Sequence, residues 1–213
     1  MLLPGDPGRA LMLAQALLEE PRMFNHHRGL WGYTGTAPDG EAVTIQATGM
    51  GGPSAVIVLQ ELIALGARRA IRVGTCGALA AGLELGSLVI APEAICADGT
   101  SRSLGAGERT RADEGTTAAL QRAAPRAHTG AVISVDLFYD ADLALADGAL
   151  AVEMEAAALF ALGAREGVAV GCVLAVSDTF DERGARHRID DHQLQGSAEA
   201  MGRAGVAALT EPG

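Results

Sequence analysis

Short runs rich in valine, isoleucine and alanine alternate along the chain with longer stretches in which apolar residues recur at helical spacing. Short apolar runs bounded by turn residues are typical of buried strands, whereas a spacing of three or four residues is typical of helices. The alternation predicts an α/β fold with helices on both faces of a central sheet. Because no repeat, linker or low-complexity segment divides the sequence, we expect a single domain over residues 1–213.

The pattern also predicts the approximate position of each element. Six strands are expected at about Trp31–Thr36, Val43–Thr48, Ala70–Val73, Leu88–Pro92, Gly130–Val135 and Val168–Val176. Five helices are expected at about Arg9–Leu18, Ser54–Leu65, Thr116–Ala123, Glu155–Arg165 and Ser197–Leu209. Asp39 and Gly40 favour a hairpin turn between the first two strands, so the central sheet is expected to be mixed. Residues 98–112, dense in Gly, Ser and Arg, are expected to form a surface loop.

Composition and charge narrow the class of partner. The 213 residues are 49% hydrophobic, enough for a substantial core without disulfides or metals. A net charge of −10 argues against a nucleic-acid partner, because such binding depends on clustered Lys and Arg. Cys76, Cys96 and Cys172 are far apart in apolar or glycine-rich sequence, so we expect reduced core thiols. No leader or membrane-spanning pattern is present in the sequence, which predicts a cytoplasmic protein with no membrane partner.

Two glycine-rich segments carry an arginine beside an apolar run, a pattern that favours anion binding. Residues 5–9 predict a turn from strand to helix, in which Gly5 permits close backbone approach and Arg9 can reach the same anion. An ordinary turn with a solvated arginine fits this segment equally well. Arg72 ends an apolar strand before Thr75, where burial of a guanidinium is costly unless an anion or a carboxylate meets it. A structural ion pair is therefore the alternative for Arg72.

Two acidic segments are candidates for a second half of the same site. Glu155 precedes a strongly apolar helix, and its carboxylate can accept two hydrogen bonds from a vicinal diol such as that of ribose. An acidic residue that stabilises the helix N-terminus is the alternative interpretation. Asp178 ends another apolar run and offers a carboxyl group able to move a proton.

Three further residues depend on context for their interpretation. Arg28, in the cationic segment 25–30, is either a third positive charge of the anion site or a solvated side chain. Met50 lies in a glycine-rich junction whose backbone amides face a ligand or form a packing turn. Phe138 stands out in a chain that is only 3% aromatic, and either stacks on a base or packs in the core.

Taken in order, seven segments resemble the nucleoside phosphorylase family, which includes hexameric purine nucleoside phosphorylases and uridine phosphorylases. They are Gly5–Pro7, Arg28–Gly29, Gly49–Gly51, Arg72–Gly77, Asp136–Tyr139, Val152–Glu155 and Ser177–Asp178. The resemblance implies the family's three-layer fold with a mixed central sheet. It also implies phosphorolysis of purine (deoxy)ribonucleosides to the free base and (deoxy)ribose 1-phosphate, by a pentosyltransferase. Inorganic phosphate is then a co-substrate, and no cofactor or metal is expected.

The resemblance assigns a role to each candidate. Gly5, Arg9, Arg72 and Thr75 match the phosphate-binding residues of the same subunit. Arg28 matches an arginine that reaches into a neighbour's site, which implies a homo-oligomer, expected to be a hexamer built as a trimer of dimers. Met154 and Glu155 match the ribose-binding pair, and Glu153 beside them is counted with the substrate-binding residues. Met50 and Phe138 match the sugar and base contacts, and Asp178 matches the acid on the purine side.

One departure from the family and three alternatives remain open. Relatives carry an arginine that adjusts the acid, but segment 183–188 is shifted here, and Arg188 is the first candidate for that catalytic role. Asp178 favours purines over the uridine phosphorylase alternative. Arg9 and Arg72 favour phosphate over water, and hence disfavour a nucleosidase that cleaves methylthioadenosine or adenosylhomocysteine. A non-catalytic nucleoside-binding protein that keeps this fold is the third alternative.

Overall fold

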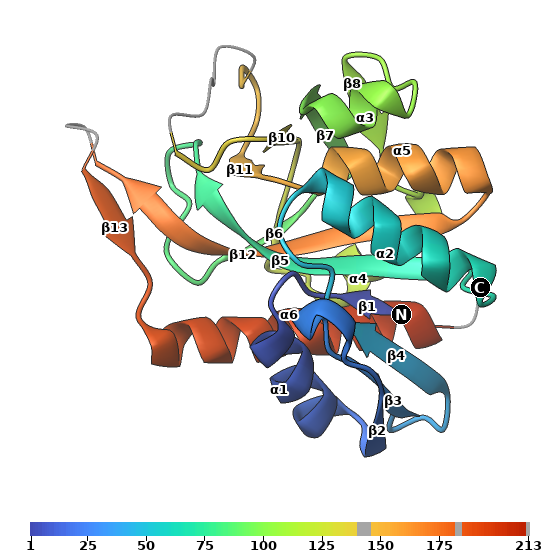
Figure 1. The fold of residues 1–213 in the computed structure, drawn as a ribbon. Coiled ribbons are helices and arrows are strands. Elements are labelled where there is room, and N and C mark those ends of the chain that lie inside the picture. The colour runs from blue at the N-terminus through green and yellow to red at the C-terminus, as the bar shows by residue number, and fades with distance from the viewer. Residues whose placement is uncertain (140–145, 182–184, 212–213) are drawn as a thin grey trace.

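The computed structural model describes residues 1–139, 146–181 and 185–211, which form a mixed sheet with helices on both faces (Figure 1). The α-helices are α1 (Pro7–Leu17), α2 (Gly52–Ala64), α3 (Gly99–Ser103), α4 (Glu114–Ala123), α5 (Ala156–Glu166) and α6 (Asp191–Thr210). The short 3₁₀ helix η1 covers His27–Gly29. The expected α/β fold is thereby confirmed. Within the described ranges, no helix is long and apolar enough to cross a bilayer.

Thirteen strands of the described chain pair into one sheet. The first seven are β1 (Leu2–Leu3), β2 (Glu19–Asn25), β3 (Gly32–Thr36), β4 (Ala42–Gln46), β5 (Arg69–Ala78), β6 (Leu88–Ile90) and β7 (Glu93–Ala97). The others are β8 (Arg109–Arg111), β9 (His128–Thr129), β10 (Val132–Val135), β11 (Ala151–Glu153), β12 (Ala169–Phe180) and β13 (Arg186–Arg188). The main path runs β2-β3-β4-β1-β5-β11-β10-β7-β8, and β12 lies along the other edge of β5.

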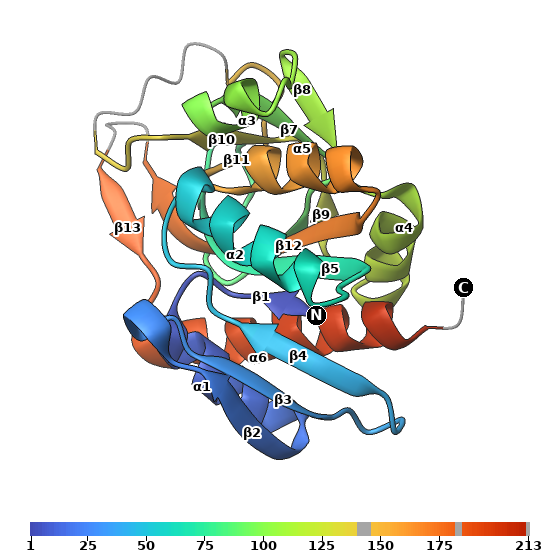
Figure 2. The same cartoon turned by 45° about the vertical axis from the view of Figure 1, so that its right-hand side comes forward.

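The long parallel pair of β5 and β12 lies at the centre of two apolar layers. On one face α5 packs against it with α2 alongside, and on the other face α4 and α6 pack against it, with α1 beside α6 and over β3 and β4 (Figure 2). Successive residues of β12 alternate between the layers, as the pleat of a strand requires: Cys172 and Leu174 face the first, and Val173 faces the second. A strand buried on both faces is apolar at nearly every position, which explains its continuous apolar run.

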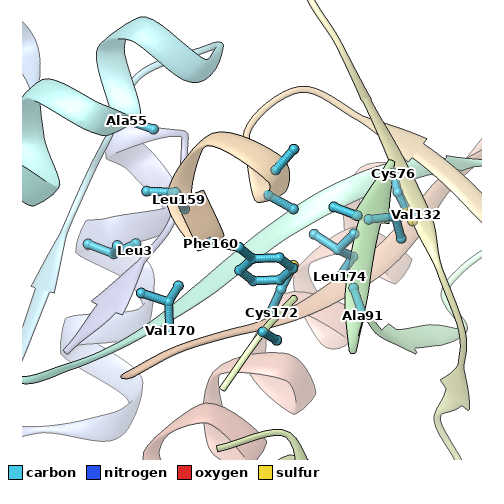
Figure 3. Close-up of a cluster of buried hydrophobic side chains, with 14 of the residues drawn as sticks. Leu3, Ala55, Cys76, Ala91, Val132, Leu159, Phe160, Val170, Cys172 and Leu174 are labelled. Carbon is cyan, nitrogen blue, oxygen red and sulfur yellow. The ribbon is translucent and has the colours of Figure 1, made fainter. Parts of the chain in front are cut away.

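Phe160 of α5 is the largest side chain in the first layer and is 1% exposed. Its ring lies among Val170, Cys172 and Leu174 of β12, and joins the helix layer to the sheet (Figure 3). Because α5 begins directly after the Glu153–Glu155 segment, this packing also fixes the position of those carboxylates.

All six expected strands and all five expected helices are present, with shifted ends. The hairpin at Asp39 and Gly40 is confirmed by antiparallel pairing of β3 with β4 and by a φ of 91° at Gly40. The expectation of a surface loop at residues 98–112 was wrong, because this segment contains α3 and β8. Asp98 and Ser101 are buried there because the Asp98 side chain accepts from the backbone and hydroxyl of Ser101 and so caps α3.

We predict that Phe160→Ala lowers the free energy of unfolding by about 3–5 kcal/mol, because it removes a fully buried ring and leaves a cavity. Leu65→Ala serves as the control, since Leu65 is 80% exposed, and its effect should stay within about 0.5 kcal/mol. Urea denaturation followed by circular dichroism measures both. Equal losses for the two variants would contradict the assignment of Phe160 to the core.

Candidate active site

Three neighbouring parallel strands, β1, β5 and β12, carry the candidate segments. Arg72 was expected to end its strand, but β5 continues to Ala78, so Arg72 lies within it. β1 lies beside β5 with Leu3 opposite Arg72, so the turn after β1 begins next to Arg72. β12 lies on the other edge of β5, where Asp178 is opposite Gly77 after an irregularity in register. Ligand sites in α/β folds commonly form at the carboxyl ends of parallel strands. The first turn therefore adjoins Arg72, whereas Asp178 lies five residues further along β5, and the gathering of all three segments into one site stays a prediction.

The glycine-rich turn at residues 5–9 directly contacts the glycine-rich junction that contains Met50. Gly49 donates its backbone N–H to the carbonyl of Gly5 at 3.0 Å, and a Cβ at Gly5 would lie 3.1 Å from the Gly49 oxygen. Asp6 caps α1 by accepting from the Arg9 backbone N–H at 2.7 Å. Arg9 is half-buried in the first turn of this helix. Burial lowers the pKa of its guanidinium; the charge of Asp6 opposes this shift, and the charge of Arg72 adds to it. The two arginines are thus electrostatic neighbours.

Arg72 is buried between two carboxylates. Its Nε donates to Glu153 Oε2 at 2.9 Å, and its Nη2 lies 2.5 Å from Glu155 Oε2. The guanidinium lies against Gly74, where a Cβ would approach its Cζ to 2.8 Å, so the position has no room for a side chain. Burial alone would lower the pKa of Arg72, but the charges of Glu155 and Glu153 outweigh it and raise that pKa. Arg72 is therefore a permanent cation.

Both interpretations of Arg72 remain compatible with this geometry. The ion pair that the sequence left as an alternative is present, and it uses the Nε and one Nη2 hydrogen. A guanidinium has five N–H groups, so three are left for a ligand. Burial raises the pKa of Glu153 against the charge of Arg72. With both glutamates ionised the cluster is net negative, and an anion beside it needs further positive charge. Arg9 supplies one such charge, since its guanidinium pairs with no acidic residue in the described part of the chain.

Glu155 links the arginine to the glycine-rich junction. Its Oε2 meets Arg72, and its Oε1 accepts from the backbone N–H of Gly51 at 2.5 Å. Thr75 is half-buried further along β5. Met154, which lies between the two glutamates in the sequence, is partly buried against a small apolar cluster. The carboxylate expected to hold a diol is thus placed directly beside the guanidinium expected to hold an anion.

Asp178 is buried at the end of β12 with an arginine and an aromatic ring nearby. Ser177 donates its hydroxyl to Asp178 Oδ2 at 2.7 Å, and Arg186 Nε donates to Asp178 Oδ1 at 2.7 Å. The Arg186 guanidinium also lies 5.1 Å from the centre of the Phe138 ring, within range of a cation–π contact. Phe138 is exposed and not in the core, so the core alternative for this residue is wrong.

The arginine that contacts Asp178 is Arg186 and not Arg188, whose catalytic role stays a prediction. The strand β13 pairs with β12 and places Arg188 opposite Asp178 along the backbone, yet the ion pair forms with Arg186 two residues earlier. Arg188 itself is exposed and forms no ion pair with any described residue. The sequence held no signal that separates the two, because both occur in one arginine-rich segment that becomes a strand instead of a helix.

Two candidates lie apart from this group. Arg28 is exposed in η1 and has a φ of 55°, a left-handed conformation that is uncommon outside glycine. Met50 is 87% exposed at the tip of the glycine-rich junction. Within the described residues of this one subunit, neither contacts the Arg72 cluster through a hydrogen bond or ion pair.

Comparison with known proteins gives this arrangement its family. The model of the Phosphorylase superfamily matches residues 1–210, and the chain belongs to that superfamily. It is 37% identical over 208 residues to a DeoD-type purine nucleoside phosphorylase of Clostridium novyi, covering 88% of this chain and 87% of that one. It is 40% identical over 195 residues to one of Bacillus cereus, covering 84% and 80%. The resemblance seen in the sequence motifs is confirmed.

Proposed function

We propose that this protein catalyses the phosphorolysis of purine (deoxy)ribonucleosides, releasing the free base and (deoxy)ribose 1-phosphate. Its superfamily and its DeoD-type relatives support the reaction class, that of a pentosyltransferase. Inorganic phosphate is the co-substrate, and no other cofactor is proposed. We also propose a cytoplasmic location, in keeping with three buried cysteines that are free thiols.

The observation that carries this proposal is the 2.5 Å contact between Arg72 Nη2 and Glu155 Oε2. Phosphorolysis needs a phosphate oxygen next to the anomeric carbon of the sugar, and so the groups that bind phosphate and sugar must adjoin. Arg9, Thr75 and the free N–H groups of Arg72 are suited to a phosphate, and Glu155 is suited to the 2′- and 3′-hydroxyls of ribose. Adjacent sites place the two reactants in contact.

The proposed mechanism follows from the charges that develop as the glycosidic bond breaks. The bond from C1′ to the base nitrogen gives its electron pair to the base, and the sugar gains positive charge. A phosphate held below C1′ stabilises that charge and then forms the new C1′–O bond with inversion. Because Glu153 and Glu155 make the Arg72 cluster net negative, Arg9 and a partner's arginine are needed to hold a phosphate dianion there.

Asp178 is proposed as the acid that assists departure of the purine. In its protonated form it donates to N7, so that the base leaves without a full negative charge; a positioned acid of this kind contributes about 10²–10⁴-fold. Arg186 is placed to stabilise the carboxylate that remains after the transfer, because it donates to Oδ1. Phe138, beside Arg186, offers a face on which the base can stack.

We propose a homo-oligomer, expected to be a hexamer assembled as a trimer of dimers, in which Arg28 completes a neighbour's phosphate site. Arg28 is exposed and away from the Arg72 cluster of its own subunit. Met23 and Phe24 on β2, directly before this segment, are 49% and 48% exposed, and half-exposed apolar side chains of this size favour contact with another protein surface.

We predict that inosine, guanosine or adenosine releases its base only when phosphate is present, because phosphate is the attacking group. Chromatography of free base and sugar phosphate, with uridine and methylthioadenosine included, measures the specificity. Base release without phosphate would support a nucleosidase. Cleavage of uridine alone would support a uridine phosphorylase, and tight binding without turnover would support a nucleoside-binding protein.

We predict that Arg186→Ala lowers kcat/KM for inosine by about tenfold or more, whereas Arg188→Ala changes it less than about twofold. The two form a matched pair, since both remove an arginine of β13 and only Arg186 contacts Asp178. Asp178→Asn should lose about 10²–10⁴-fold on inosine. A 7-methylated purine nucleoside, whose base needs no proton at N7, should be affected far less. Equal losses on both substrates would overturn the acid role.

We predict that Arg9→Ala and Arg28→Ala are each nearly inactive but regain activity when their subunits are mixed after dissociation. If each arginine serves a different site of a reciprocal pair, every mixed pair has one intact site, giving about a quarter of wild-type activity in an equal mixture. Light scattering reports the assembly. A monomer, or a mixture as inactive as its components, would contradict the shared site.

A further inference from the structure

Ser134 of β10 is a buried hydroxyl to which the proposed mechanism gives no role. It lies opposite Glu153 in the parallel pairing of β10 with β11, so the two side chains share a face of the sheet. Its Oγ donates to Glu153 Oε1 and accepts the backbone N–H of Ala157 at 2.9 Å. The hydroxyl is therefore fixed by a strand on one side and by the first turn of α5 on the other.

Glu153 has both carboxylate oxygens occupied by donors of the protein. Oε1 accepts from Ser134 and from the Ala156 N–H at 3.1 Å. Oε2 accepts from Arg72 Nε, from the Glu155 N–H and from the Ala156 N–H, each at 2.9 Å. The side chain is 0% exposed, and a carboxylate has about four lone-pair positions for these bonds. Glu153 thus has neither the exposure nor the free acceptor capacity for a substrate contact.

We propose that Ser134 and Glu153 are positioning residues for Arg72, which replaces the substrate-binding role expected for Glu153. The inference rests on the proposed function, since it concerns how Arg72 presents its remaining N–H groups to phosphate. Ser134 and the Ala156 N–H hold Oε1, and together they fix the plane of the carboxylate. Oε2 then fixes the Nε edge of the guanidinium and leaves the opposite edge directed away from Glu153.

Loss of the Ser134 hydroxyl leaves Oε1 with only the longer bond from the Ala156 N–H at 3.1 Å, which loosens the plane of the carboxylate, and it also removes the acceptor of the Ala157 N–H. The Nε edge of Arg72 then loses its fixed partner, whereas Glu155 keeps its bond to the Gly51 N–H. The phosphate side of the site should therefore suffer more than the ribose side. A hydrogen bond to a charged group of this kind corresponds to roughly tenfold in an equilibrium constant.

The test compares Ser134→Ala with Thr116→Val in the full-length protein. Thr116 is also buried at a helix N-terminus and donates its hydroxyl to a carboxylate, that of Asp113 at 2.7 Å, but it lies on α4. We expect Ser134→Ala to raise the KM for phosphate about tenfold with less than a twofold change in the KM for inosine. Thr116→Val should change neither, and Ser134→Thr, which keeps the hydroxyl, should restore the phosphate KM.

A second readout does not depend on turnover. In ¹⁵N spectra of arginine side chains, the Arg72 Nε–H signal, assigned by its loss in Arg72→Lys, should exchange slowly in the wild type and faster in Ser134→Ala. Ser134→Cys, which keeps the volume with a poor donor, replaces the alanine variant if that variant does not fold. Equal changes in both KM values, or an unchanged Nε–H signal, would overturn the positioning role. Absence of inosine phosphorolysis in the wild type would instead overturn the proposed function. The Nε–H result would then decide the positioning role of Ser134 and Glu153.

Discussion

The buried guanidinium of Arg72, held between Glu153 and Glu155, is the interaction on which the site depends. Taking a charge out of water costs several kcal/mol, and removal of one partner of a buried pair typically destabilises a protein by about 3–5 kcal/mol. The cluster therefore constrains the strands and the glycine that position its three side chains. β5 must present Arg72, β11 must end with Glu153 against the guanidinium, Glu155 must follow it before α5, and Gly74 must lack a side chain because the guanidinium lies there.

The same carboxylates also determine where α5 begins. The backbone N–H groups of Glu155 and Ala156 have no acceptor within the helix, and Glu153 satisfies both, while Ser134 satisfies that of Ala157. One acidic side chain thus caps a helix and orients an arginine at once. This explains how a net negative cluster persists in the interior: its excess charge lies against several N–H groups at the positive end of the helix dipole.

The sequence predicted five of the six α-helices of the described chain but only six of its thirteen strands, because most of the others are two to five residues long. The six strands and five helices carried clear apolar patterns, but β2 did not, because Glu19, Glu20 and Pro21 open it and its pairing with β3 alone makes it a strand. The motifs identified Arg72 and Glu155, yet their contact joins positions far apart in the sequence, and no local pattern reports it. Arg186 was missed because its contact with Asp178 depends on β13 folding back along β12.

The two halves of the site differ in how freely they can change. Around Arg72 each buried polar group has its partners, so a substitution there leaves an unsatisfied charge and costs stability as well as binding. On the purine side, Phe138 is 57% exposed and Arg186 is 36% exposed, and surface substitutions are usually tolerated within about 0.5 kcal/mol. If the proposed roles hold, substitutions at Phe138 and in β13 can change base preference at little cost in stability, whereas the proposed phosphate and sugar groups around Arg72 cannot change so freely.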